Sequence, residues 1–313
     1  MKAIRVHRLG GPEVLELDEV AEPVPAPGEV SIRVHAAGVN PVDCKTRRNA
    51  APAGWGQTLP FIPGWDAAGV VEQVGPEVTA FRPGDEVFGM VAFPQPGRAY
   101  AEVTVSPATD LAVRPPGLDA LHAAAAPLAA LTAWQALFDG AALAAGQRVL
   151  IHAAAGGVGH LAVQLAKWRG AHVIGTASGR NLDFVRGLGA DEVIDYTRTP
   201  LAGAVSDLDL VLDPMGGETR AQSWPLLKPG GLLVSIVGAP DPQAAADHGV
   251  RALGIFVHTS GSQLGEIAAL LGSGTLRPHL DRVYPLADAA AAHRQVEEGH
   301  VRGKVVLQVA DRG

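Results

Sequence analysis

The stretch from His152 to Trp168 constrains the fold of this chain more than any other, because it joins an apolar strand to a helix through small residues. Residues 149–151 read as a short buried strand, and the apolar spacing over 161–168 predicts a helix. Between them, Gly156 allows the backbone to approach a phosphate, and Gly159 allows the helix to pack close to the strand. The segment therefore predicts a dinucleotide-binding turn at the N-terminus of a helix.

The surroundings of this turn supply the first candidate binding residues. We expect its backbone to hold a diphosphate through four consecutive residues, namely Ala155, Gly156, Gly157 and Val158. Ala154 stands where such motifs usually carry their first glycine, which weakens the motif when it is taken alone. The strand before it and the helix after it support the interpretation.

The end of the following strand predicts which dinucleotide is bound. Nineteen residues after Gly159, where an acidic side chain would accept hydrogen bonds from an adenosine ribose, the sequence has Ser178, followed by Arg180. A hydroxyl donor and a guanidinium favour a 2′-phosphate, and so NADPH over NADH. The alternative is that both residues only form a solvated loop.

Composition excludes several classes of partner. The 313 residues are 47% hydrophobic, and 32 acidic against 25 basic residues leave no basic block of the kind that binds nucleic acid. No apolar run reaches 18 residues, so we expect no membrane span and a cytoplasmic location. Cys44 is the only cysteine, which excludes an internal disulfide and a multi-cysteine metal site. A small-molecule partner remains the best expectation.

The order of the elements predicts two domains and an α/β fold class. Residues 1–118 show short β-type runs separated by Gly and Pro, which is typical of a mainly antiparallel, barrel-like domain. From about Ala120, strand-like runs alternate with helical stretches, as in a doubly wound parallel sheet. Periodicity does not show whether the C-terminal segment returns to the first domain.

Several further motifs, in this order, resemble the medium-chain dehydrogenase/reductase superfamily and its zinc-free quinone oxidoreductase group. They are GVNPVDC at 38–44, PFIPGWDAAGVVEQVG at 60–75, PGDEVFG at 83–89, LTAWQAL at 131–137, GADEVIDY at 189–196 and KPGGLLVSIVG at 228–238. The resemblance implies a GroES-like domain, 1–118 rejoined by 262–313, around a Rossmann domain, 119–261, with the nicotinamide in the cleft between them. It also implies a homodimer.

The same comparison bears on metal binding. Zinc-dependent members of the superfamily hold the catalytic ion with a Cys and a His-Glu pair, and the matching positions here are Asn40, Trp65 and Asp66. The histidines show no HExxH or comparable spacing. We therefore expect no metal, and without a Lewis acid the reduction of an acceptor is easier to support than the ionisation of an alcohol.

The resemblance also implies roles for single residues, each with a plainer alternative. Thr132 matches a residue beside the nicotinamide or its ribose, or it only caps a helix start. Tyr196 matches a tyrosine near the adenosine phosphate, or it packs at a strand end. Lys304 matches a cofactor-side residue, or it is a solvated lysine. Asn40 either donates a hydrogen bond to the acceptor or cofactor, which makes it the one candidate catalytic residue, or it ends a strand before Pro41.

Two further pairs complete the expected cofactor site. Val237 and Gly238 lie at the carboxyl end of a predicted strand, where open parallel sheets bind ligands. Phe256 and Val257 match a loop that meets the carboxamide in the resembling family.

We expect NADPH-dependent reduction of a small acceptor, either a quinone or an α,β-unsaturated carbonyl compound. Two alternatives remain: an alcohol dehydrogenase with unusual zinc ligands, and an NADPH-binding protein without enzymatic activity.

Overall fold

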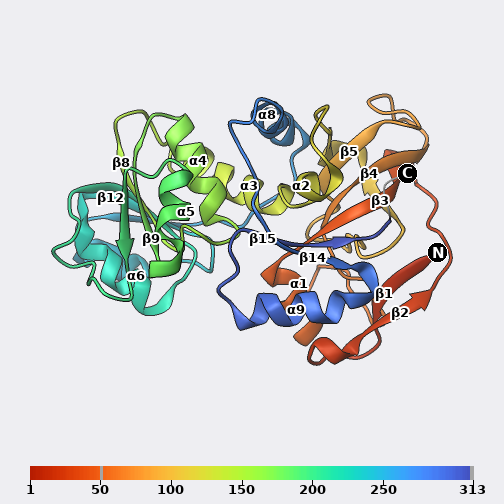
Figure 1. Ribbon diagram of the computed structural model, residues 1–313, viewed down its shortest axis with the longest axis horizontal. Coiled ribbons are helices and arrows are strands. Elements are labelled where there is room, and N and C mark those ends of the chain that lie inside the picture. Colours follow the sequence, from red (N-terminus) through yellow and green to blue (C-terminus); the bar gives the residue numbers. More distant parts are fainter. Residues whose placement is uncertain (50–51, 311–313) are drawn as a thin grey trace. The chain divides into compact units, whose positions relative to one another are not determined.

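The computed structural model describes residues 1–49 and 52–310 and divides into two compact units (Figure 1). Unit 1 comprises Met1–Leu131 and His258–Gly313, and unit 2 comprises Thr132–Val257. The expected borders were 118/119 and 261/262. Residues 119–131 fall in unit 1 because helix α2 (Ala120–Ala124) packs on strands of that unit.

Unit 2 is built on one six-stranded sheet in which every neighbouring pair is parallel. Its strands are β8 (Arg148–Ile151), β9 (His172–Ala177), β10 (Glu192–Asp195), β11 (Leu208–Asp213), β12 (Leu227–Ser235) and β13 (Arg251–Gly254). Across the sheet the strands lie in the order β10-β9-β8-β11-β12-β13, so the chain builds the sheet outward in one direction from β8 to β10 and in the other direction from β11 to β13. This is the doubly wound order of dinucleotide-binding sheets, which confirms the expected fold class.

Helices connect these strands. They are α4 (Gly159–Trp168), α5 (Leu182–Gly187), α6 (Gly217–Ser223) and α7 (Pro242–Asp247), with 3₁₀ turns at Gly179–Asn181 and Trp224–Leu226. Helix α3 (Pro127–Trp134) leads into a π-helical segment, Gln135–Gly140. The middles of the central strands are apolar, as expected for a sheet whose two faces are both covered, and Leu150, Ile174 and Val211 are completely buried.

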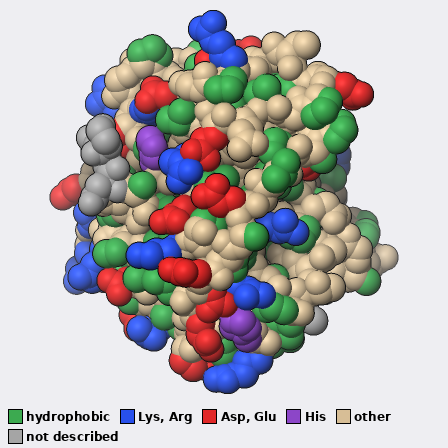
Figure 2. Space-filling view, turned by 90° about the vertical axis from the view of Figure 1, so that its right-hand side faces the viewer, with side chains coloured by type: hydrophobic (Ala, Val, Ile, Leu, Met, Phe, Trp, Pro, Cys, Tyr) green, Lys and Arg blue, Asp and Glu red, His purple; other side chains and the backbone are tan. Residues whose placement is uncertain are grey.

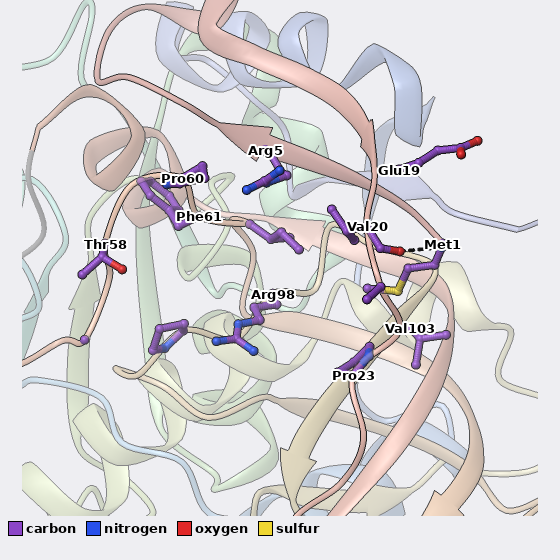
Figure 3. Close-up of a pocket in the computed structure, with 14 residues that line it drawn as sticks. Met1, Arg5, Glu19, Val20, Pro23, Thr58, Pro60, Phe61, Arg98 and Val103 are labelled. Atoms are coloured by element: carbon purple, nitrogen blue, oxygen red, sulfur yellow. Dashed lines mark hydrogen bonds between the residues drawn. The ribbon is translucent and has the colours of Figure 1, made fainter.

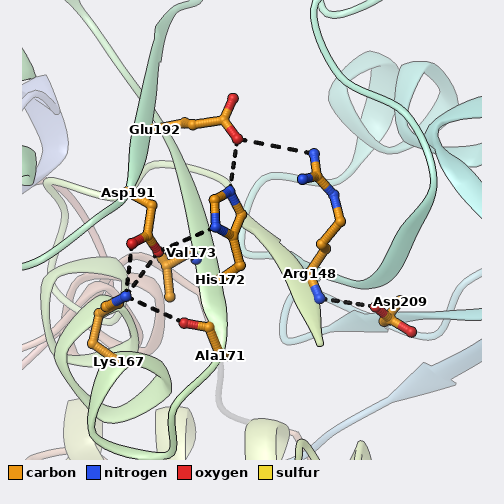
Figure 4. Close-up of polar contacts among 8 residues, drawn as sticks. All are labelled: Arg148, Lys167, Ala171, His172, Val173, Asp191, Glu192 and Asp209. Carbon is orange, nitrogen blue, oxygen red and sulfur yellow. Dashed lines mark hydrogen bonds and ion pairs between the residues drawn. The ribbon is translucent and has the colours of Figure 1, made fainter. Parts of the chain in front are cut away.

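The amino-terminal edge of this sheet carries a polar network (Figure 4). Asp191 accepts hydrogen bonds from Lys167 Nζ at 2.8 Å and from the backbone N–H of Val173 at 2.7 Å, and Glu192 lies 2.7 Å from His172. The charged groups of this edge pair with one another. The opposite, carboxyl-terminal edge is the one where such sheets bind ligands.

Unit 1 contains a seven-stranded sheet and a two-stranded sheet. Its strands are β1 (Lys2–Val6), β2 (Leu15–Glu19), β3 (Glu29–Val39), β4 (Asp66–Val74), β5 (Glu86–Met90), β6 (Val103–Pro107), β7 (Leu111–Val113), β14 (Leu280–Pro285) and β15 (Lys304–Gln308). The larger sheet runs β14-β15-β3-β4-β5-β7, with β6 also on β3, and only the β14–β15 pair is parallel. The C-terminal strand thus returns to the first domain through β3, as the resemblance implied.

Short 3₁₀ turns and helices complete unit 1. They are Pro12–Val14, α1 (Pro41–Arg48), Ala108–Asp110, α2, α8 (Gly261–Gly272), Leu286–Asp288 and α9 (Ala289–Glu298). Strand β3 lies at the centre of the core: Val30, Ile32 and Val34 are at most 1% exposed and pack with residues of β4, β5 and β15. Fully burying each such side chain stabilises the fold by roughly 1.5–3 kcal/mol.

The charge distribution on the surface bears on the expectation that the partner is a small molecule and not a nucleic acid. On the face shown in Figure 2, basic side chains alternate with acidic ones and form no continuous basic area. Among the described residues, no helix is both long and apolar enough to span a membrane.

Candidate dinucleotide site and buried polar cluster

The predicted turn lies between β8 and α4, and Gly159 is fixed there by close packing. A Cβ atom at position 159 would lie 2.2 Å from the carbonyl oxygen of Ala153 and 2.9 Å from the Cα of Ala154. Neither backbone atom can rotate away, so only glycine fits. A Cβ at Gly156 would lie 3.2 Å from the same oxygen, which is tight but not excluded. The N-terminal amides of α4 therefore open onto a narrow bend, as a diphosphate requires.

The strained residue of the bend is not the one that the motif suggests. Ala153, one position before Ala154, has a φ of +46° in the left-handed region that favours glycine. Ala154 is completely buried, and its Cβ lies 2.9 Å from the position that a Cβ at Gly175 would take. The alanine that departs from the usual motif is therefore a packing residue, and the conformational demand falls on its neighbour.

The adenosine end of the site includes a carboxylate that the sequence does not reveal there. Ser178 directly follows β9, and Arg180 lies exposed in the turn after it. Strand β10 pairs Asp195 with Ala177, and the Asp195 carboxylate comes within 2.9 Å of where a Cβ on Gly179 would be. Tyr196 follows it and is 51% exposed. The expectation that no carboxylate lies at this strand end is wrong, because the next strand supplies one.

Exposed apolar side chains mark the other half of the carboxyl edge. Val237 lies two residues beyond β12 and is 42% exposed, and Phe256 lies two residues beyond β13 and is 63% exposed. Gly238 has a φ of +110°, and Val257 is half-buried. Met215, which we did not identify from the sequence, follows β11 and is 57% exposed. A flat, partly apolar ring would cover such side chains.

Arg220 holds together the loops that follow β11 and β12, which carry Met215 and Val237. Arg220 of α6 donates to Asp213 Oδ2 at 2.7 Å, to Ser235 Oγ at 2.6 Å and to the carbonyl oxygen of Gly238 at 3.3 Å. Burial would raise the pKa of Asp213, but donors from Gly216, Arg220 and Met215 hold it below the ordinary value. This set of contacts could not be predicted from the sequence, because Arg220 and its partners come from α6, β11 and the end of β12.

Two of the predicted residues, Asn40 and Lys304, meet in a buried polar cluster in unit 1. The Lys304 ammonium donates to the Val39 carbonyl at 3.1 Å and to Asn40 Oδ1, and it lies 3.5 Å from Asp66 Oδ2. The Asn40 amide donates to the same Asp66 oxygen at 2.9 Å. Lys304 is 3% exposed. The alternative of a solvated lysine is therefore wrong.

Burial dominates the protonation of this cluster. It raises the pKa of Asp66 and lowers that of Lys304, because each charged form loses its hydration, while the attraction between the two charges opposes both shifts. Asp43 accepts from the backbone N–H of Asn40 at 2.7 Å and so helps to cap α1. Burial raises the pKa of Asp43 to about 7 although the Tyr100 hydroxyl also donates to it at 3.2 Å.

Two neighbours complete the interior of unit 1. His293 Nε2 lies 3.2 Å from the Tyr100 hydroxyl, and burial lowers the pKa of His293 to about 3, which keeps the ring neutral. Burial likewise raises the pKa of the Cys44 thiol to about 12. Cys44 is therefore a buried thiol that stays protonated near neutral pH.

The residues at the position of the superfamily's zinc site do not fit a zinc ion. Asn40 and Trp65 are not zinc ligands of the usual kinds, and the Trp65 indole N–H donates to the Gln95 carbonyl at 2.7 Å. Asp66, the one carboxylate, is already bound by Asn40, by Lys304 and, at 2.8 Å, by the backbone N–H of Leu128. Within residues 1–49 and 52–310, the one group of three potential ligands within 4.8 Å of one another is the exposed His7, Glu16 and Asp18.

Thr132 does not have the helix-capping role that was one of its two predicted roles. It is the sixth residue of α3 and is 5% exposed, so it does not cap the start of that helix. Trp55, Trp65 and Phe93 form an edge-to-face aromatic cluster with ring centroids 5.3–6.0 Å apart. Phe61, in contrast, lines a separate cavity of about 460 Å³ next to Arg5 and Arg98 (Figure 3).

Comparison with known proteins identifies the family. Residues 26–116 match the alcohol dehydrogenase GroES-like domain, and residues 188–307 match the zinc-binding dehydrogenase model. Quinone oxidoreductase of Sus scrofa is 35% identical over 331 residues, which cover 98% of this chain and 97% of that protein.

Solved structures agree with this assignment. The quinone oxidoreductase from Coxiella burnetii superposes with a TM-score of 0.92 at 37% identity, covering 99% of both chains. The mycobacterial protein Rv1454c complexed with NADPH superposes with a TM-score of 0.89 at 32% identity, covering 99% of this chain and 100% of that one. The chain therefore belongs to the quinone oxidoreductase group of the medium-chain dehydrogenase/reductase superfamily and is an NAD(P)H-dependent oxidoreductase.

Proposed function

We propose that this oxidoreductase transfers hydride from NADPH to a quinone or to an α,β-unsaturated carbonyl compound, without a catalytic metal. The observation that carries the proposal is the bend at Gly159, where backbone atoms exclude a side chain and no side chain among the described residues caps the N-terminus of α4. When bound, the reduced nicotinamide supplies the hydride, and the protein orients the reactants and excludes water.

In this proposal, the residues of unit 2 divide the cofactor among them. The backbone of Ala155, Gly156, Gly157 and Val158 holds the diphosphate, and Ser178, Arg180 and Tyr196 hold the adenosine 2′-phosphate. Val237, Gly238, Phe256, Val257 and Thr132 contact the nicotinamide and its ribose. The preference for NADPH is supported by the hydroxyl of Ser178 and the guanidinium of Arg180 at the end of β9. It is also supported by the NADPH complex of the mycobacterial relative.

The acceptor side is assigned to the buried cluster of unit 1. Asn40 uses one amide N–H on Asp66, and we assign the other to the oxygen of the acceptor or to the cofactor. Lys304 acts through Asn40: its ammonium holds Asn40 Oδ1, which fixes which way the amide faces. The proton that completes the reduction comes from solvent. Zinc independence is supported by the misfit of Asn40, Trp65 and Asp66 to a zinc ion.

Two further assignments accompany the activity. We propose a homodimer formed through edges of the unit 2 sheets, since β10 and β13 are its outer strands and leave backbone groups unpaired. We also place the protein in the cytoplasm, which fits a chain with a single, buried cysteine. Light scattering tests the first assignment and cell fractionation the second.

An acceptor screen tests the proposed activity. NADPH oxidation is followed by absorbance with quinones, enones and enals, and zinc content is measured on the same sample. We expect acceptor-dependent oxidation that survives chelation. Tight NADPH binding without turnover on any acceptor indicates a non-enzymatic protein, and stoichiometric zinc lost together with activity indicates an alcohol dehydrogenase; either result refutes the proposal.

A second test concerns the cofactor. The Arg180→Ala variant removes a charged hydrogen-bond donor, which is worth about 1–3 kcal/mol and so roughly tenfold to a hundredfold in the dissociation constant for NADPH. The dissociation constant for NADH should stay unchanged. Equal weakening of both cofactors would show that Arg180 does not contact the 2′-phosphate.

A further inference from the structure

The carboxylate of Asp195 lies close to the turn where many dinucleotide folds carry the acidic residue that discriminates between NADH and NADPH. In many dinucleotide folds that residue comes about 20 positions after the glycine motif and accepts hydrogen bonds from the ribose 2′-hydroxyl. Here that position belongs to Ser178, at the end of β9. Asp195, at the end of β10, pairs with Ala177, and its Oδ2 lies 2.9 Å from where a Cβ on Gly179 would be. The neighbouring strand thus brings the carboxylate next to Gly179, in the turn that also carries Ser178 and Arg180.

The two oxygens of Asp195 have different partners. Oδ1 accepts from the Thr197 backbone N–H at 3.0 Å and from the Thr197 hydroxyl at 2.6 Å, which fixes the orientation of the carboxylate. Oδ2 faces the backbone of Gly179, and Arg198 Nε lies 3.9 Å from it on a side chain that is 86% exposed. The Thr197 hydroxyl is the main reason why the pKa of Asp195 lies below its ordinary value. The group is therefore an ionised, oriented carboxylate whose Oδ2 faces the turn at Gly179.

We propose that Asp195 is a specificity-determining residue that restrains the preference for NADPH created by Ser178 and Arg180, and so keeps NADH usable. The proposal rests on the proposed function of the unit 2 site. A 2′-phosphate carries a charge of about −1.5 to −2 and is repelled by Asp195, whereas the 2′-hydroxyl of NADH donates a hydrogen bond to Oδ2. Gly179 is also needed for this discrimination, because a Cβ at position 179 would displace the Asp195 carboxylate.

The test compares Asp195→Asn with the unmodified protein by calorimetric titration. The probes are NADPH, NADH and the fragments 2′,5′-ADP and 5′-ADP, which report on the adenosine end alone. Asparagine retains an oxygen for Thr197 and replaces the facing oxygen with an N–H donor. The dissociation constants for NADPH and 2′,5′-ADP should fall about tenfold, which corresponds to about 1.4 kcal/mol of relieved repulsion, because the phosphate carries nearly two negative charges and Asp195 carries one. Those for NADH and 5′-ADP should stay within twofold or rise.

Two further variants isolate the cause. Asp247→Asn makes the same change of net charge on α7, which packs against β13 at the other edge of the sheet, and it should leave all four constants unchanged. Asp195→Ser removes the charge without adding an amide donor and should shift the preference in the same direction. Melting temperatures confirm that each variant is folded.

The outcomes separate this inference from the function on which it rests. If the unmodified protein binds neither NADPH nor NADH, the proposed function fails. If it binds both, and if Asp195→Asn and Asp195→Ser leave the ratio of the NADPH and NADH constants within twofold of the original, the proposed function stands and the role of Asp195 is refuted.

Discussion

Substituting Gly159 with alanine should break the dinucleotide site from within. The new Cβ would lie 2.2 Å from the Ala153 carbonyl oxygen, and moving that contact even to 3.0 Å needs a shift of about 0.8 Å between strand end and helix. Overpacking of this kind costs about 1–3 kcal/mol. The same oxygen accepts a hydrogen bond from Gly156 N–H at 2.8 Å, and its loss adds about 1 kcal/mol. The gain in helix propensity, at most about 1 kcal/mol, is smaller.

We therefore expect Gly159→Ala to lower the free energy of unfolding by about 1–4 kcal/mol and to weaken NADPH binding at least tenfold. Urea denaturation followed by tryptophan fluorescence gives the first quantity, and calorimetric titration the second. Gly187→Ala is the matched control. Position 187 ends helix α5, and a Cβ there meets nothing within 4 Å, so this variant should be neutral or slightly more stable. If Gly159→Ala behaves like Gly187→Ala in both assays, the argument about the bend is refuted.

Three other predictions concern buried charges and can be checked by denaturation. Lys304→Met leaves the Asp66 carboxylate without its counter-charge and should destabilise the protein by about 3–5 kcal/mol, whereas adding Asp66→Asn should recover most of that loss; no recovery would contradict the pairing. The pKa of Asp43 rises from 3.8 to about 7 on folding, so the native state binds the extra proton and stability falls as pH rises from about 4 to 7. Asp43→Asn should remove roughly 4 kcal/mol of that fall, and parallel stability profiles for the variant and the parent would contradict the assignment. Arg220→Ala leaves Asp213 buried without its cation and should cost about 2–5 kcal/mol and weaken NADPH, while the exposed Arg186→Ala should cost less than about 1 kcal/mol; equal effects would exclude the clamp.

The sequence predicted the parts of the fold that depend on local pattern. The alternation of apolar strands and helices after residue 120 predicted five of the six strands of unit 2, and the glycine run placed the turn correctly. Strand β13 was missed, because an edge strand that reads RALG and is largely exposed has no apolar signal. In unit 1, the short β-type runs predicted a mainly antiparallel domain but not the pairing of β15 with β3. The family resemblance implied only that the C-terminal segment returns to this domain.

The site was less predictable where distant segments meet. Lys304 and Asp66 are 238 residues apart in the chain, so their contact could not be read from spacing. The approach of Asp195 to Gly179 depends on the register of β10 against β9, which no local motif specifies. The left-handed conformation of Ala153 is likewise a property of the folded bend, because alanine gives no signal for it.

The most direct test of the account is a crystal structure of the protein with NADPH. We predict the diphosphate on the backbone amides between Ala155 and Gly159, with the 2′-phosphate beside Ser178 and Arg180. A structure with the diphosphate elsewhere and the bend at Gly159 empty would contradict the central claim.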